Sequence, residues 1–98
     1  MESFKDVISS GQLVLVDFYA TWCGPCQTMH PVLLELKQRL GEQVRILKID
    51  VDKYQNTAAE YRIQSVPTLM LFRNGQMLWR QSGALPLNAL LQQVQAHL

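Results

Sequence analysis

Long apolar runs, an excess of one charge and nucleotide-binding glycine motifs are all missing from this sequence. Nine Lys and Arg face eight Asp and Glu, a formal net charge of +1, so the basic surface of a nucleic-acid binder or membrane-surface helix is absent. The longest apolar run is far below the roughly 18 residues of a membrane span. Residues 1–12 mix charged and polar groups, unlike a signal peptide. We therefore expect no nucleic-acid or membrane partner.

Cysteine is also scarce, with two residues in 98. Two cysteines without a secretory signal indicate a reducing, cytoplasmic compartment and a catalytic or metal-binding role. A bridge between Cys23 and Cys26 would close a very short loop and stabilise the fold by about 2 kcal/mol, against about 5 kcal/mol for a loop of about 100 residues. A chain of this length is expected to form a single domain, residues 1–98, without a stabilising disulfide. We therefore interpret the two cysteines as reactive groups and not as a structural cross-link.

Hydrophobic periodicity predicts an α/β chain. Strands are predicted at four apolar runs: 13–18, 44–51, 68–72 and 77–80. Helices are predicted at four stretches with helical spacing: 2–10, 24–40, 54–62 and 86–98. Pro31 is expected to kink the second helix, and Asn74-Gly75 predicts a tight hairpin between the last two strands. The order implies a parallel pair joined through a helix, an antiparallel hairpin, and helices on both faces of the sheet.

The two cysteines lie where a buried strand gives way to a helix, in the segment Trp22-Cys23-Gly24-Pro25-Cys26. Free N–H groups and the positive end of the helix dipole favour an anion there, so the Cys23 thiol becomes more acidic. Cys26 follows one turn later and is placed to attack a mixed disulfide formed on Cys23. Gly24 and Pro25 add little bulk to this turn, so we expect the Cys23 sulfur to be accessible.

Other interpretations of the cysteines remain open at this stage. They could be two small buried hydrophobic residues, or half of a zinc site. Cys23, Cys26 and His30 could supply three metal ligands, but structural zinc usually takes four, and the only other histidine is His97. Gln27 stands where the haem-attachment signature needs histidine. His30 is more consistent with a surface or supporting residue, and we expect no metal.

Asp17 interrupts an otherwise apolar strand. Burying an ionised carboxylate is costly, so we expect Asp17 to be neutral or its pKa to be raised. The alternative is a half-exposed position at which the carboxylate remains solvated.

Residues 15–26, Leu-Val-Asp-Phe-Tyr-Ala-Thr-Trp-Cys-Gly-Pro-Cys, resemble the active-site segment of the thioredoxin family almost residue for residue. Pro31 is similar to the helix-kinking proline of that family, and Val66-Pro67-Thr68 to its cis-proline loop. Gly83-Ala84 is similar to its last substrate-facing loop. The similarity extends from about residue 3 to the end of the chain.

The resemblance implies a thioredoxin fold, with a mixed central sheet of about four strands and helices on both faces. It makes Cys23 the exposed nucleophile and Cys26 the buried resolving thiol. Asp17 would exchange a proton with Cys26 through water, and Lys48 would lie near that carboxylate. The Val66–Pro67 bond would be cis. Substrate would contact Trp22, Gly24, Pro25, Val66, Pro67, Gly83 and Ala84.

The function implied is reduction of protein disulfides, with disulfide-containing clients as substrates. No metal or organic cofactor is expected. Because the chain has no Gly-rich dinucleotide motif, electrons would come from a separate thioredoxin reductase. The alternatives are an oxidant or isomerase with the same fold, a non-catalytic module that binds partners around Trp22, Pro67 and Ala84, and the metal-binding module described above.

Two departures from the family pattern stand out. Tyr19 occupies a position where many thioredoxins have a second tryptophan. Thioredoxins also usually carry a strand ahead of their first helix, and there is no room for one before residues 2–10. We therefore predict that strand 44–51 is an open edge of the sheet. The protein is expected to be a monomer, with self-association through that edge as the alternative.

Overall fold

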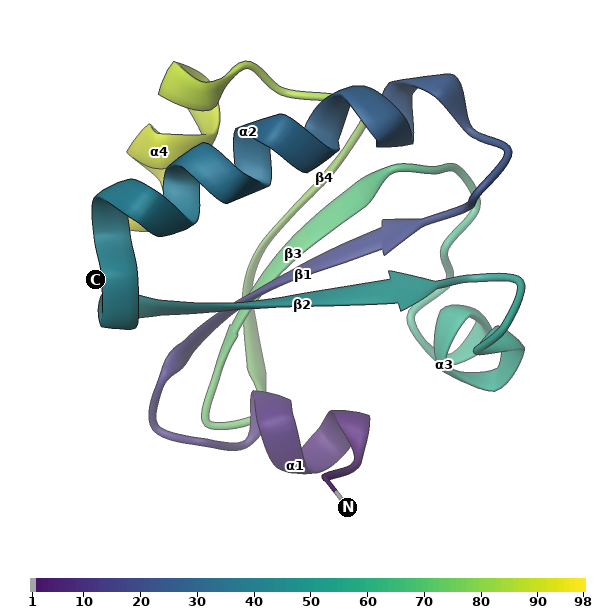
Figure 1. Ribbon diagram of the computed structural model, residues 1–98. Helices are drawn as coiled ribbons and strands as arrows, with labels where there is room; N and C mark the ends of the chain where they lie inside the picture. The colour runs from purple at the N-terminus through teal and green to yellow at the C-terminus, as the bar shows by residue number, and fades with distance from the viewer. Residues whose placement is uncertain (1) are drawn as a thin grey trace.

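A computed structural model describes residues 2–98 of the chain as alternating helices and strands (Figure 1). Its helices are α1 (Phe4–Ile8), α2 (Gly24–Leu40), α3 (Gln55–Glu60) and α4 (Leu87–Gln95). Its strands are β1 (Leu13–Tyr19), β2 (Val44–Asp50), β3 (Thr68–Arg73) and β4 (Gln76–Ser82). The predicted order is confirmed, but the first helix has only five residues where the sequence predicted nine.

The four strands form one mixed sheet in the order β2-β1-β3-β4. β1 pairs in parallel with β2, and α2 makes the crossover between them, while β3 runs antiparallel to both β1 and β4. The predicted hairpin is confirmed, with Asn74 and Gly75 at positive φ angles of 54° and 78°. The register sets Asp17 opposite Lys48 on β2 and Leu69 on β3.

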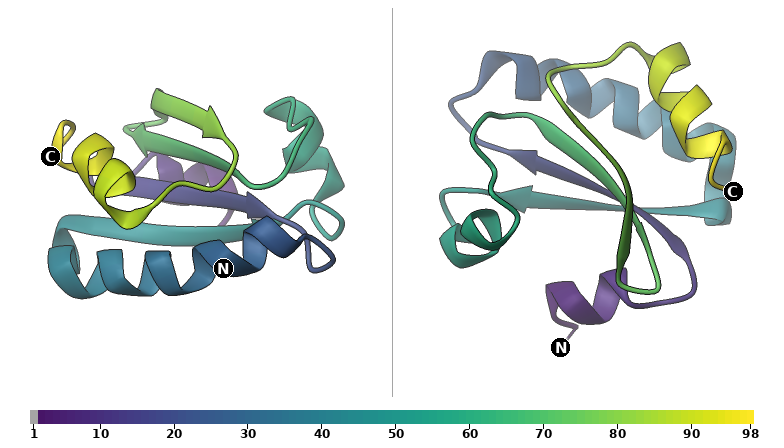
Figure 2. Two further views of the ribbon diagram at one scale, coloured as in Figure 1. Left: turned by 90° about the horizontal axis from the view of Figure 1, so that it is seen from above. Right: turned by 180° about the vertical axis from the view of Figure 1, so that it is seen from behind.

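Strand β1 is buried on both faces because helices cover each side of the sheet. Figure 1 and the two views of Figure 2 show α2 and α4 on one face and α1 and α3 on the other. Leu13 and Leu15 pack in the cluster under α2 and α4, whereas Val14 and Val16 pack in the cluster under α1. Successive strand residues point to opposite faces, so Asp17 lies on the face that α2 covers.

Helix α2 carries the cysteine pair at one end and packs its apolar side on the sheet. Met29, Leu33, Leu36 and Leu40 are its buried large residues, at helical spacing. The helix continues through Pro31 as one element of 17 residues and ends at Gly41, whose φ is 56°. This packing holds the N-terminal turn of α2 in a fixed position at the end of β1.

Helix α1 is short and depends on its N-cap. The Asp6 N–H donates to Ser3 Oγ at 3.1 Å, and the Ser3 N–H donates to the Asp6 carboxylate at 3.2 Å. Such a reciprocal capping box satisfies two backbone donors that a helix leaves free.

Replacing Ser3 with alanine is therefore expected to lower the free energy of unfolding by about 1 kcal/mol. Chemical denaturation measures this change, with Ser9→Ala at the other end of α1 as the control, because Ser9 caps that end through its backbone N–H. A loss from Ser9→Ala equal to that from Ser3→Ala would contradict the role of the cap.

The outer edge of β2 is unpaired within residues 2–98, as the sequence predicted for strand 44–51, and β4 forms the other edge. Arg45 lies at this edge and donates to Glu2 at 2.8 and 3.3 Å. No helix in the described part of the chain is both long enough and apolar enough to cross a bilayer.

Candidate active site

Cys23 and Cys26 are joined by a disulfide at the start of α2, with their Cα atoms 5.3 Å apart. Cys23 is the N-cap of the helix, and the Cys26 N–H donates to Cys23 Sγ at 3.1 Å. Pro25 lies in the first turn, where its missing N–H costs nothing. The same N–H and the helix dipole would stabilise a thiolate on Cys23 once the bond is reduced.

Both cysteines are buried in this oxidised form, each 4% exposed. The prediction of a buried Cys26 is therefore confirmed, whereas the prediction of an exposed Cys23 is wrong for this redox state. The reason is that Cys23 Sγ contacts its partner sulfur on one side and lies 3.6 Å from the Val66 carbonyl oxygen on another. Gly24 and Pro25, between the cysteines, are exposed as expected from the turn.

The loop before β3 faces the cysteine pair. The Val66–Pro67 peptide bond is cis, which confirms the prediction from the sequence. The Gly83 N–H donates to the Pro67 carbonyl at 2.8 Å, so the loop after β4 is tied to the cis-proline loop. Gly83 has a φ of 95°, a conformation that favours glycine, and Ala84 beside it is exposed. Three segments distant in sequence therefore meet around the disulfide.

Trp22 is the most exposed large apolar side chain among the described residues, at 72%. Its indole Nε1–H donates to Asp52 Oδ2 at 2.8 Å, which fixes the ring beside the cysteines. Trp22 and Val66 also line a shallow surface pocket of about 170 Å³. Asp52 was not predictable from the sequence, because it lies 30 positions from Trp22 and no local motif includes it.

Asp17 is fully buried, as its place in an apolar strand predicted. Within residues 2–98 neither carboxylate oxygen has a hydrogen-bond partner. Burial raises the pKa of Asp17 from 3.8 to about 6, and the positive charge of Lys48 opposes part of that rise. Thr68 is the other buried polar side chain in the described part of the chain, and its hydroxyl is hydrogen-bonded to Ser65 and Ser82. Asp17 is thus a carboxyl group that changes protonation near neutral pH in an apolar setting.

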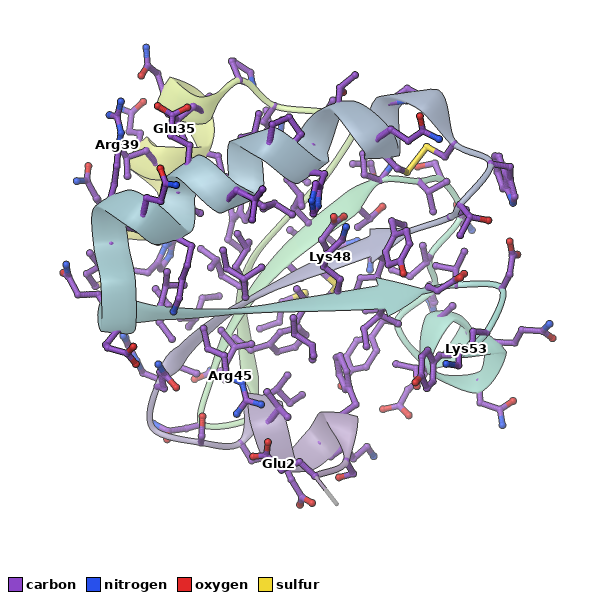
Figure 3. The ribbon with its side chains drawn as sticks, in the orientation of Figure 1. Glu2, Glu35, Arg39, Arg45, Lys48 and Lys53 are labelled. Atoms are coloured by element: carbon purple, nitrogen blue, oxygen red, sulfur yellow. A yellow bond between two sulfur atoms is a disulfide. The ribbon has the colours of Figure 1, made fainter. Side chains whose placement is uncertain are left out.

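Lys48 lies beside Asp17 in the sheet register but does not bond to it. Its ammonium donates to His30 Nδ1 at 3.3 Å and lies 4.7 Å from the centre of the Tyr19 ring. Figure 3 shows the Lys48 side chain between β2 and α2. The prediction that Lys48 lies near the carboxylate holds for the backbone position, while its charged end is held by His30 and Tyr19.

The metal-binding interpretation finds no support in the geometry. Residues 2–98 contain no group of three or more His, Cys, Asp or Glu side chains placed to hold a metal ion. The sulfurs of Cys23 and Cys26 are bonded to each other, and His30 contacts Lys48.

Reversible opening and closure of the Cys23–Cys26 bond is the reaction that this arrangement offers, which makes the site that of a thiol–disulfide oxidoreductase. The family model described as Thioredoxin matches residues 1–96, and the chain belongs to the thioredoxin family. A thioredoxin-like protein of Synechocystis is 52% identical over 94 residues, covering 95% of this chain and 90% of that protein. Thioredoxin of Bacillus subtilis is 44% identical over 97 residues, covering 99% and 92%.

Solved structures agree with this assignment. Oxidised mitochondrial thioredoxin 3 of Saccharomyces cerevisiae superposes with a TM-score of 0.86 at 38% identity, covering 95% of this chain and 86% of that one. Length varies among the relatives: chloroplastic thioredoxin Y of rice is 46% identical over 97 residues, and the match covers 98% of this chain but 58% of that protein.

Proposed function

We propose that the protein reduces disulfide bonds in other proteins by two successive thiol–disulfide exchanges. The observation that carries the proposal is the position of Cys23 Sγ at the N-terminus of α2, within hydrogen-bond distance of the Cys26 N–H and beside the Val66 carbonyl. Reduction would leave a thiolate on Cys23 that this N–H stabilises, beside the backbone of Val66, along which an extended client peptide can lie.

In the first exchange, the Cys23 thiolate attacks one sulfur of the client disulfide. The client's S–S bond breaks, its second sulfur leaves as a thiolate and takes up a proton, and Cys23 is now in a mixed disulfide with the client. Exposed Trp22, Gly24, Pro25 and Ala84 surround the point of attack. The Gly83 N–H is bonded to the Pro67 carbonyl, so these two residues shape the surface and the backbone of Val66 is proposed to pair with the client chain.

In the second exchange, Cys26 attacks Cys23 Sγ, the mixed disulfide breaks, and the client leaves in the reduced form. The chain is left with the Cys23–Cys26 bond seen in the structure. Cys26 must first lose its proton. Asp17 is proposed as the acceptor, acting through water, because a buried carboxylate with a pKa of about 6 takes a proton at neutral pH more readily than an ordinary aspartate. Lys48 is proposed to stabilise the ionised carboxylate.

Returning the protein to its dithiol form needs two electrons from outside the chain. We propose a separate thioredoxin reductase as their source, and a reducing, cytoplasmic compartment as the setting. The working state proposed is the monomer. The outer edge of β2 is the surface through which two copies would pair, and the charged side chains of Arg45 and Lys48 on that strand oppose such pairing.

Equilibration with glutathione buffers tests the direction of the reaction. We take the family's own value of about −270 mV as the expected reduction potential; disulfide isomerases lie near −180 mV. About 30 mV corresponds to a tenfold change in the equilibrium constant of this two-electron couple, so the two outcomes differ by about a factor of 1,000. Alkylation of free thiols followed by mass measurement gives the reduced fraction, and Cys23→Ser, which cannot form the intramolecular bond, is the control. A potential near −180 mV or above would identify an isomerase or oxidant instead.

A further inference from the structure

Cys26 is reached from the surface through a pocket next to the active site. The pocket has a volume of about 340 Å³ and lies between β1, α2 and β2. Its lining residues are Tyr19, Ala20, Thr21, Cys26, Gln27, His30 and Lys48. His30 and Lys48 come from different elements, α2 and β2, and their side chains meet at its rim. A proton that leaves Cys26 for solvent through this pocket passes these two side chains.

The Lys48 ammonium has two partners, and Asp17 is not one of them. It donates to His30 Nδ1 at 3.3 Å and lies over the Tyr19 ring at 4.7 Å. Asp17 occupies the paired position on the neighbouring strand, with no hydrogen-bond partner among residues 2–98. Since Lys48 is the positive charge that acts on this carboxylate, the distance between the two groups governs how readily Asp17 ionises.

We propose that His30 is a positioning residue, whose imidazole holds the Lys48 ammonium at the pocket rim and away from the Asp17 carboxyl. A neutral imidazole with its proton on Nε2 leaves the Nδ1 lone pair free to accept from Lys48. When His30 is protonated it has no acceptor and carries the same charge as Lys48. The ammonium is then released toward Asp17. Protonation of His30 therefore favours ionisation of Asp17.

The other charged groups near this pair have partners of their own. Lys37 of α2 and Arg45 of β2 line a neighbouring pocket with His30 and Lys48. Lys37 donates to the Gly41 and Val44 carbonyls at 2.8 and 2.7 Å, and Arg45 is bound to Glu2. Both are cations, so neither offers Lys48 an acceptor that would replace His30. The remaining titratable groups that face the pair are Tyr19 and Asp17 on β1, and Cys26 on α2 once it is reduced.

Titration of the Asp17 carboxyl carbon by NMR in the oxidised protein tests the proposal without any turnover. His30→Ala is expected to lower the apparent pKa of Asp17 by about half a pH unit, a threefold change in proton affinity, because Lys48 is then free to approach. His30→Gln keeps an acceptor oxygen and is expected to stay near wild type. An unchanged or raised pKa in His30→Ala would overturn the proposal.

The double variant separates positioning from a direct effect of His30. In a Lys48→Gln background, His30→Ala is expected to leave the Asp17 titration unchanged, because there is no ammonium to release. The same shift with and without Lys48 would show that His30 acts on Asp17 by another route, and the proposal would fail.

An effect of His30 on catalysis rests on the proposed function, in which Asp17 accepts the proton from Cys26. A second measurement tests this effect. The rate at which Cys26 resolves a glutathione mixed disulfide on Cys23 should have a pH midpoint that moves with Asp17 in His30→Ala. A shifted Asp17 titration with an unmoved midpoint would support positioning by His30, while removing Asp17 from the proposed proton transfer.

Discussion

Replacing Cys23 with serine is expected to reduce the rate of insulin disulfide reduction to that of dithiothreitol alone. The variant keeps the fold, because a disulfide that spans one helical turn contributes only about 2 kcal/mol. It loses the sulfur at the N-cap of α2, which accepts from the Cys26 N–H and lies beside the Val66 carbonyl. Insulin turbidity in the presence of dithiothreitol measures the rate.

Cys26→Ser is the matched control for this result. It retains the attacking thiol, so it should form a mixed disulfide with insulin or with a dithionitrobenzoate reagent and then stop, since nothing resolves the bond. Mass measurement of the trapped adduct distinguishes it from Cys23→Ser, which should form none through position 23. Equal turbidity rates for wild type and Cys23→Ser would indicate the partner-binding module instead.

Asp17→Asn is expected to stabilise the protein at pH 7 by about 2–3 kcal/mol. The pKa of Asp17 is raised from 3.8 to about 6 by burial, so the folded chain binds this proton more tightly than the unfolded chain. The stabilising contribution is complete below pH 3.8, is lost as the pH rises toward 6, and is absent at pH 7. Holding the carboxylate ionised at pH 7 then costs about 3 kcal/mol, most of which the neutral amide avoids.

Urea denaturation of the oxidised protein between pH 3.5 and 8 measures this effect. Wild type should lose stability between about pH 4 and pH 6 relative to Asp17→Asn, and the two curves should converge at low pH. Glu42→Gln removes an exposed carboxylate and should leave the wild-type pH dependence in place. If Asp17→Asn retained the full wild-type slope, the carboxyl group responsible would lie elsewhere. The same substitution should slow resolution by Cys26, so stability and activity should change in opposite directions.

The element order and the cysteine pair were predictable because they depend on local signals. Apolar runs specify the buried strands, and the strand-to-helix junction specifies where the thiols lie. The burial of Asp17 was predictable for the same reason, since a residue within an apolar strand that is covered on both faces is buried whatever its own polarity. The capping box at Ser3 is also local, and the spacing Ser3-x-x-Asp6 could have indicated it.

The contacts between distant segments were not predictable. Trp22 meets Asp52, and Lys48 meets His30, because the parallel register of β1 and β2 brings their following loops and α2 together. No spacing rule encodes that register. The burial of Cys23 escaped prediction likewise, since it depends on Val66, which lies 43 positions later in the chain. The reacting groups can therefore be predicted from the sequence, whereas their surroundings depend on the tertiary fold.

The cysteines are only three positions apart, so a change of redox state rearranges the covalent chain within a single turn of α2. Both cysteines lie in a small buried cluster with Ala20, and neither belongs to the two large core clusters on either side of the sheet. Oxidation and reduction can therefore alternate many times while the scaffold stays folded. This suits a protein that is oxidised and reduced repeatedly, because it does not have to refold between one redox cycle and the next.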